Sequence, residues 1–158
     1  MISAYADGLR MLARRELSVA GVRARLLDRE HPPDAVETAI AQLIENGSLD
    51  DRRVARAYAR TAATVKGRGR LRVLRELAAM GIAREVAAEA VGEVFSEVDE
   101  RSLIAKAIQK KMRGRARLAT VQDRARLYQF LVRQGFTPAA IAAAMRRLPG
   151  ARAQPDVD

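Results

Sequence analysis

Residues 77–94 of this chain read LAAMGIAREVAAEAVGEV, and they decide the fold because the same pattern occurs three times. Shifted forward by 54 positions, the stretch lies over residues 131–148, and Gly81 falls on Gly135. Shifted back by 51 positions, it lies over residues 26–43 with the same spacing of apolar residues. Each copy contains two helix-length apolar patterns separated by a turn. The sequence therefore predicts three tandem repeats of one helical unit.

Helical signals extend from this stretch along the rest of the chain. Between turn signals, apolar residues return every three or four positions. Thr137 stands before Pro138, the pattern of an N-cap hydroxyl followed by proline at the first helical position. Ser96 followed by Asp99 resembles a capping box and predicts a helix that starts at Ser96. Runs of β-branched residues with alternating polarity, which are typical of strands, are absent.

These signals predict an all-α fold of nine helices and no strands. We expect one three-helix repeat in residues 1–47, a second in residues 48–95 and a third in residues 96–148. One such repeat is too short to bury much apolar surface, so neighbouring repeats should share contacts. Residues 149–158 contain two prolines and no apolar periodicity, and we expect a disordered tail there.

The composition excludes several classes of protein. The 158 residues include no cysteine, so the chain has no disulfide, thiolate zinc site or cysteine nucleophile, which fits a reducing compartment. No apolar run approaches the ~20 residues of a membrane span. Asp7 and Arg10 interrupt the apolar residues near the start, which argues against a signal peptide. We expect a soluble, cytoplasmic, monomeric protein with no membrane partner.

The positive charge is concentrated in the later repeats. The formal net charge of the whole chain is +10, from 29 Lys and Arg against 19 Asp and Glu. The net charge is −1 over residues 1–47, +4 over residues 48–95 and +7 over residues 96–158. Such an asymmetry indicates an acidic partner, with nucleic acid as the first candidate.

Two basic runs and one basic row are the candidate binding residues for nucleic acid or another acidic partner. Neither run contains an acidic residue. The first run consists of Lys66, Arg68, Arg70, Arg72 and Arg75, and the second consists of Lys106, Lys110, Lys111, Arg113, Arg115 and Arg117. The row consists of Arg52, Arg56 and Arg60, whose spacing of four places them on one helix face without Glu partners. Phosphates or an acidic protein groove would neutralise these charges, although a solvated face is the alternative explanation.

The few aromatic residues favour contact with a nucleic-acid backbone over contact with bases. Tyr58 and Tyr128 occupy positions in apolar stripes, so we expect them in the core rather than as stacking platforms. Contact through the basic residues would then be independent of nucleotide sequence.

No catalytic, metal-binding or cofactor-binding pattern stands out, and we predict a protein that is not an enzyme. Gly67-Arg68-Gly69 lacks the further glycine of a dinucleotide site and follows no strand, which favours a helix end and turn. His31 stands alone beside two prolines, and we expect a surface or turn-packing role rather than that of a ligand or base. Asp50 and Asp51 suit the start of a helix better than a metal site.

An ordered set of short motifs resembles the RecX family of regulatory proteins. The motifs are Gly47-Ser48-Leu49-Asp50-Asp51-Arg52-Arg53-Val54-Ala55, Tyr58, Gly67-Arg68-Gly69, Glu76-Leu77 and Gly81-Ile82. Members of the family typically read Gly-Tyr-Leu-Asp-Asp, then Phe-Ala, then Gly-x-Gly before Glu-Leu-x-x-x-Gly. The resemblance covers residues 4–148. This chain departs from the family at Ser48, at Val54, and at Glu30-His31, where a glycine is usual after the second helix.

The resemblance implies a modulator of the RecA recombinase. Family members form elongated, curved arrays of three-helix units that lie in the groove of the RecA–DNA filament. They inhibit strand exchange and ATP hydrolysis, and they limit the co-protease activity behind the SOS response. The implied partners are RecA and RecA-coated single-stranded DNA, and direct contact with DNA is left open. The alternative is a stand-alone DNA-binding protein made of helix-turn-helix-like units.

Overall fold

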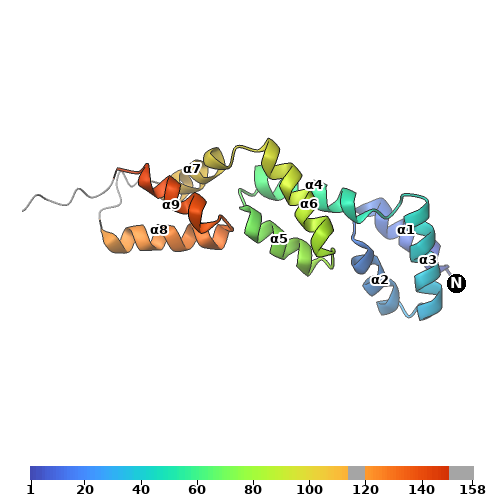
Figure 1. The fold of residues 1–158 in the computed structure, drawn as a ribbon. Coiled ribbons are helices and arrows are strands. Elements are labelled where there is room, and N and C mark those ends of the chain that lie inside the picture. Colours follow the sequence, from blue (N-terminus) through green and yellow to red (C-terminus); the bar gives the residue numbers. More distant parts are fainter. Residues whose placement is uncertain (114–119, 150–158) are drawn as a thin grey trace, which may run out of the picture. The chain divides into compact units, whose positions relative to one another are not determined.

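The computed structural model describes residues 1–113 and 120–149, and these residues form helices and no strands, as predicted. Figure 1 shows the helices in chain order. In the described ranges there are nine of them: α1 (Ala4–Arg14), α2 (Val19–Asp28), α3 (Pro33–Glu45), α4 (Asp51–Thr64), α5 (Arg70–Ala79), α6 (Arg84–Glu97), α7 (Glu100–Lys111), α8 (Val121–Gln134) and α9 (Pro138–Arg146). The predicted tail lies outside the described residues from residue 150 onward.

The helix bounds recur with the predicted spacing. Helix α5 begins and ends 51 positions after α2, and α6 begins 51 positions after α3. Helix α9 begins 54 positions after α6. We therefore call α1–α3, α4–α6 and α7–α9 the first, second and third repeats, while their boundaries at residues 47 and 95 stay predictions.

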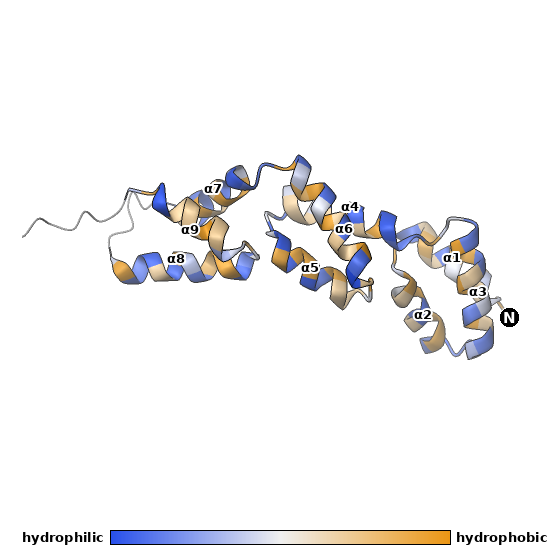
Figure 2. Ribbon diagram, in the orientation of Figure 1, coloured by the Kyte–Doolittle hydropathy of each residue, from blue (hydrophilic) through white to orange (hydrophobic). Residues whose placement is uncertain are grey.

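The chain also divides into two compact units whose boundaries pass through α4, α5 and α6. Unit 1 contains residues 1–60 and 74–94, and unit 2 contains residues 61–73 and the chain from residue 95. The helices are amphipathic, with hydrophobic and hydrophilic residues interleaved along each of them (Figure 2).

The core of the first repeat lies in unit 1 and is made of aliphatic side chains. Val22, Leu26, Val36 and Leu43 are fully buried. Gly8 of α1 lies against this core, since a Cβ there would be 2.9 Å from Cδ1 of Leu43. The glycine therefore lets α1 approach α3 closely.

One buried carboxylate ties α1 to the turn after α2. Asp7 is only 5% exposed, and Arg29 donates a hydrogen bond to it. Nε2 of His31 lies 2.9 Å from Oδ2 of Asp7. The predicted turn-packing role of His31 is confirmed, and Asp7 is the partner that the sequence did not reveal.

The start of α2 packs against the turn between α5 and α6. The hydroxyl of Ser18 donates a hydrogen bond of 2.7 Å to the carbonyl of Met80, and the backbone N–H of Val19 donates to Oδ1 of Asp51 at 2.9 Å. Gly81 has a φ of +78°, and a Cβ there would lie 2.4 Å from the Cβ of Ala20. Only glycine satisfies both the backbone angle and the available space.

The start of α5 packs in the same way against the turn between α8 and α9, within unit 2. The backbone N–H of Gly69 donates to the carbonyl of Gln134 at 2.8 Å, and that of Leu71 donates to the carbonyl of Gly135 at 2.9 Å. Gly135 has a φ of +100°, and a Cβ there would lie 2.3 Å from the Cβ of Arg72. The backbone at the start of α5 thus directly contacts the backbone of the turn between α8 and α9.

These two contacts, which we call the joints, occupy equivalent positions. Met80 and Gln134 are 54 positions apart, and Ser18 and Gly69 are 51 positions apart. The carbonyl at the equivalent position therefore accepts a hydrogen bond in each joint. The donor is the hydroxyl of Ser18 in the first joint and the backbone N–H of Gly69 in the second. The repeats share contacts, as the sequence predicted.

Helix caps agree with the sequence at two predicted positions. Oδ1 of Asp50 accepts hydrogen bonds from the N–H groups of Arg52 and Arg53 at 3.0 and 3.3 Å, which satisfies the first turn of α4. The hydroxyl of Thr137 accepts from the N–H of Ala140 at 3.2 Å. Gly67 has a φ of +65° between α4 and α5, which confirms the predicted turn.

The prediction of a helix starting at Ser96 was wrong. Helix α6 continues through this serine to Glu97, and Val94 and Phe95, directly before the serine, are buried. Asp99 is instead the N-cap of α7, and it accepts hydrogen bonds from the N–H of Arg101 and Ser102. The hydroxyl of Ser102 donates back at 2.8 Å, and together these bonds hold the pKa of the Asp99 carboxyl below its usual value.

Replacing Glu30 by glycine should stabilise the protein. Glu30 is equivalent to Gly81 and Gly135 and has a φ of +63°, a conformation that strains a residue with a Cβ. We expect Glu30→Gly to raise the free energy of unfolding by about 1 kcal/mol, measured by urea denaturation. Glu30→Ala, which keeps the Cβ, is the control and should show no comparable gain. Equal stability of the glycine variant and the parent would contradict this account.

Replacing Gly135 by alanine should disrupt a joint. The new Cβ would overlap Arg72 in addition to straining the backbone, so we expect a loss of more than about 3 kcal/mol in unfolding free energy. Gly47→Ala is the matched control, since Gly47 has a φ of +79° but nothing within 4 Å of its Cβ position. It should lose only about 1–2 kcal/mol. Similar losses at both glycines would argue against the joint.

Candidate nucleic-acid interface

Unit 2 contains a groove of about 440 Å³ that is lined by lysines from both basic runs. The groove lies between the end of α4, helix α7 and helix α8. Its four basic residues are Lys66, Lys106, Lys110 and Lys111. The rest of its described lining is uncharged and includes Leu103, Phe130 and exposed Val65. We call it the lysine groove.

Helix α7 places most of this charge. Lys106 and Lys110 are four positions apart and so lie on one face of α7. Neither forms an ion pair with a residue that the structure describes. The ammonium of Lys111 lies 5.1 Å from the centre of the Phe130 ring, a cation–π contact that orients the lysine. Lys106 and Lys110 thus add positive charge without an ion-pair partner among the described residues, and they lie beside the apolar lining of the groove.

The basic surface continues along α8. A neighbouring groove of about 730 Å³ is lined by Lys111 and Arg113, together with Arg126 and Arg133 of α8. Sequence reasoning missed these two arginines, although their spacing of seven puts them on one helix face. Asp123 also lines this second groove, which makes it less uniformly positive than the lysine groove. Arg115 and Arg117 lie outside the described residues.

The first basic run is divided among several surroundings. Arg70 pairs with Glu100 at 3.6 Å, and its guanidinium lies 5.2 Å from the centre of the Phe95 ring. Arg72 packs on Gly135, and Arg75 lines a groove of unit 1. Arg68 lies in the turn before α5 and is half-buried. Arg70 and Arg72 are two positions apart on α5 and so face different directions, and the arginines of this run do not share one groove.

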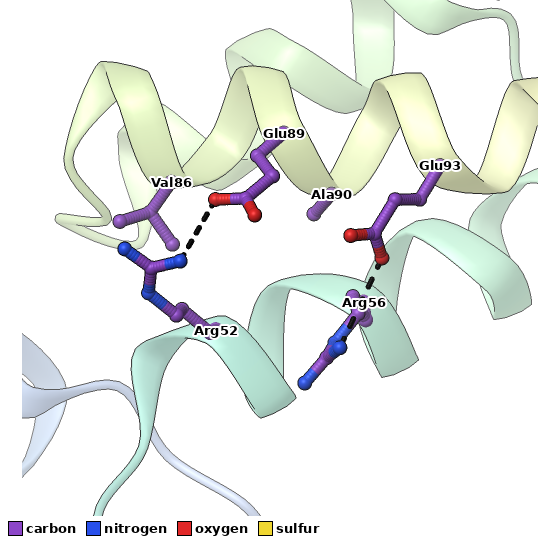
Figure 3. Close-up of a pocket in the computed structure, with 6 residues that line it drawn as sticks. All are labelled: Arg52, Arg56, Val86, Glu89, Ala90 and Glu93. Atoms are coloured by element: carbon purple, nitrogen blue, oxygen red, sulfur yellow. Dashed lines mark hydrogen bonds and ion pairs between the residues drawn. The ribbon is translucent and has the colours of Figure 1, made fainter.

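The arginine row on α4 has acidic partners, and the prediction that it lacks them was wrong. Nη1 of Arg52 lies 2.9 Å from Oε2 of Glu89, and Nη1 of Arg56 lies 3.9 Å from Oε2 of Glu93 (Figure 3). The glutamates come from α6, 37 positions later, so spacing within one helix could not reveal them. All four side chains are about half exposed, and such pairs add little stability. They do compensate the charge of the row.

Arg60 continues the row at an exposed position, one turn beyond Arg56. Tyr58, between them, is half-buried and donates a hydrogen bond to Glu76. Tyr128 is half-buried as well. Neither tyrosine is placed as an open platform for a nucleotide base.

The described residues show neither a candidate metal cluster nor a membrane-spanning helix. Within residues 1–113 and 120–149, no three His, Cys, Asp or Glu side chains are grouped so that they could hold a metal ion. None of the helices in these ranges is long and apolar enough to cross a membrane.

Comparison with known proteins gives the family. Models of the first, second and third three-helix domains of RecX match residues 4–43, 50–91 and 99–145. The regulatory protein RecX of Chromohalobacter salexigens is 33% identical over 131 residues, which cover 82% of each chain. The chain belongs to the RecX family. The RecX of Thermus thermophilus is 38% identical over 145 residues, 92% of this chain and 91% of the relative.

Solved structures show the same fold. RecX from Lactobacillus salivarius superposes with a TM-score of 0.79 at 19% identity and covers 90% of this chain and 92% of its own. A second crystal structure, of a regulatory protein RecX, gives a TM-score of 0.82 at 21% identity and covers 90% and 71%. Family membership makes the chain a non-enzymatic regulatory protein and a modulator of RecA.

Removing lysines from the lysine groove should weaken binding to nucleic acid more than removing paired arginines. We expect Lys106→Gln with Lys110→Gln to reduce the slope of log affinity against log salt by about 1.4 for a thymidine oligonucleotide. The measurement is fluorescence anisotropy at several salt concentrations.

Arg52→Gln with Arg56→Gln is the matched control. It also removes two charges four positions apart, but these are compensated by Glu89 and Glu93. It should change the slope less. Equal slopes for the two double variants would show that net charge alone governs binding.

Proposed function

We propose that this RecX-family chain binds the RecA–DNA filament through the lysine groove and thereby inhibits ATP hydrolysis, strand exchange and co-protease activity. The observation that carries the proposal is the groove itself. It gathers Lys66, Lys106, Lys110 and Lys111 without an acidic residue in its described lining. RecA is the partner that the family implies. The monomeric state and the cytoplasmic location stay predictions.

Phosphate is the ligand that fits this groove best. Lysine ammonium groups are compact charges that can follow a phosphate backbone without a fixed bidentate geometry. Phe130 is engaged by Lys111, so it does not offer a free face for a base. Contacts of this kind position a protein on nucleic acid without selecting a sequence. A filament that covers DNA of any sequence requires this property of its regulator.

The charge asymmetry supports the same assignment. The first repeat carries almost no net charge, whereas the lysine groove belongs to the most basic part of the chain. A polyanion would therefore meet the later repeats first, since long-range attraction steers association. Several weak contacts spread over tandem repeats would add their affinities.

The proposed function predicts inhibition of RecA. The parent protein should lower single-strand-dependent ATP hydrolysis and strand exchange by RecA at sub-stoichiometric to stoichiometric ratios. Lys106→Gln with Lys110→Gln should require at least about five-fold more protein for half inhibition, because each lost phosphate contact weakens binding. Arg52→Gln with Arg56→Gln should inhibit nearly as well as the parent.

A folded parent protein that leaves both RecA activities unchanged at every ratio would overturn the proposal. The alternative is a stand-alone DNA-binding protein. It would bind bare single strands as tightly as RecA-coated strands and would not affect RecA. Measuring both affinities on one oligonucleotide separates the two functions.

A further inference from the structure

A second groove lies in unit 1, between α5 and α6, and its composition differs from that of the lysine groove. It measures about 470 Å³. Ile82 and Ala87 are buried at its floor, and the small side chains of Ala78 and Ala88 leave its sides open. Leu74 is half-buried in its lining, and the charged residues of the groove are Arg75 and Arg84. We call it the arginine groove.

The first repeat shows what fills the equivalent place. Arg23 and Glu37 stand 51 positions before Leu74 and Ala88. Nε of Arg23 donates to Oε1 of Glu37 at 2.7 Å, and Nη2 donates to Oε2 at 3.3 Å. This bidentate bond lowers the pKa of Glu37 and raises that of Arg23, so both are ionised. The first repeat thus bridges its α2 and α3 with its own carboxylate.

The second repeat lacks this bridge. Leu74 and Ala88 replace the arginine and the glutamate, and Ala78 replaces the larger Leu27. Arg75 and Arg84 form no ion pair with any side chain of the described part of the chain. The result is an open apolar trough with two uncompensated guanidinium groups.

The third repeat differs again. Tyr128 and Val132 stand 54 positions after Leu74 and Ala78, and both are larger than the residues they replace. Among the described grooves, only that of the second repeat combines small apolar walls with arginines and no acid.

We propose that the arginine groove binds a protein segment of the partner in which an apolar side chain is flanked by carboxylates. The inference rests on the proposed function for the identity of the partner, RecA, and adds a surface that recognises its protein rather than its DNA. The carboxylates would take the role that Glu37 plays in the first repeat.

The chemistry of the groove favours protein over nucleic acid. A phosphate backbone would leave the accessible apolar lining of Leu74, Ala78 and Ala88 without a partner, whereas an aliphatic side chain would cover it. The planar guanidinium group binds a carboxylate through two parallel hydrogen bonds. Charge complementarity and the apolar lining therefore both favour a protein segment in which an apolar side chain is flanked by carboxylates.

Transplanting the bridge of the first repeat tests the inference. Leu74→Arg with Ala88→Glu should form the same ion pair and close the groove, while the net charge of the protein stays constant. We expect binding to RecA-coated single strands to weaken at least about ten-fold, measured by surface plasmon resonance. Binding to the bare oligonucleotide should not change. Circular dichroism and thermal unfolding check that the variant is folded.

A second variant removes the charges and leaves the trough open. Arg75→Gln with Arg84→Gln should also weaken binding to RecA-coated strands, by about five-fold or more. Arg52→Gln with Arg56→Gln is the matched control because it changes the net charge equally but removes arginines that Glu89 and Glu93 compensate. It should bind RecA-coated strands like the parent.

Two outcomes would overturn the inference. A folded Leu74→Arg, Ala88→Glu protein that binds RecA-coated strands as tightly as the parent would show that the groove is not used. Equal losses on bare and on coated strands would make the groove a nucleic-acid site. Either result leaves inhibition of RecA by the parent intact, whereas failure of the parent to bind RecA-coated strands would overturn the proposed function as well.

Discussion

A single hydrogen-bonded contact organises the tandem repeats: the start of one helix meets the carbonyl before a glycine turn more than sixty residues later. Ser18 binds the carbonyl of Met80, and Gly69 binds that of Gln134. The contact exists only because Gly81 and Gly135 have no Cβ and accept a positive φ. The arginine groove lies on α5 and α6, which the first joint contacts at the turn between them, and the lysine groove includes α8, which the second joint contacts at its end.

The fold could be predicted from the sequence because the helices that meet at the joints recur at similar spacings, 51 and 54 positions. Glycine turns recur at Gly81 and Gly135, and the spacing of apolar residues recurs with them. These two copies of the pattern are enough to locate the third copy in residues 26–43, which lacks the glycine. Local cap signals were less reliable. Ser96 has the right neighbours for a cap, yet buried Phe95 keeps it inside α6, because tertiary burial outweighs a preference of about 1 kcal/mol.

The candidate site was only partly predictable for a physical reason. A charge run contains only residues that are close in sequence, whereas a groove is lined by residues that the fold brings together from distant parts of the chain. Lys66 joins Lys106 across forty positions of sequence, which no run could show. Conversely, Arg52 looked uncompensated because Glu89 lies on another helix. Spacing within a helix predicts which residues share a face, but it does not predict which side chains a neighbouring helix places opposite that face.

In these tandem repeats, the positions that hold the fold together differ from the positions that are free to vary between repeats. Positions that make the joints keep their geometry even when their chemistry changes, as Ser18 and Gly69 show. Positions that face solvent between the second and third helices of a repeat are not held to any such geometry. There, the first repeat closes the gap with Arg23 and Glu37, while the second leaves it open beside Arg75. The first repeat shows that this backbone can carry the bridge, so the fold does not require the second repeat to lack it. The open groove of the second repeat leaves room for the external carboxylate that we propose as the partner of Arg75.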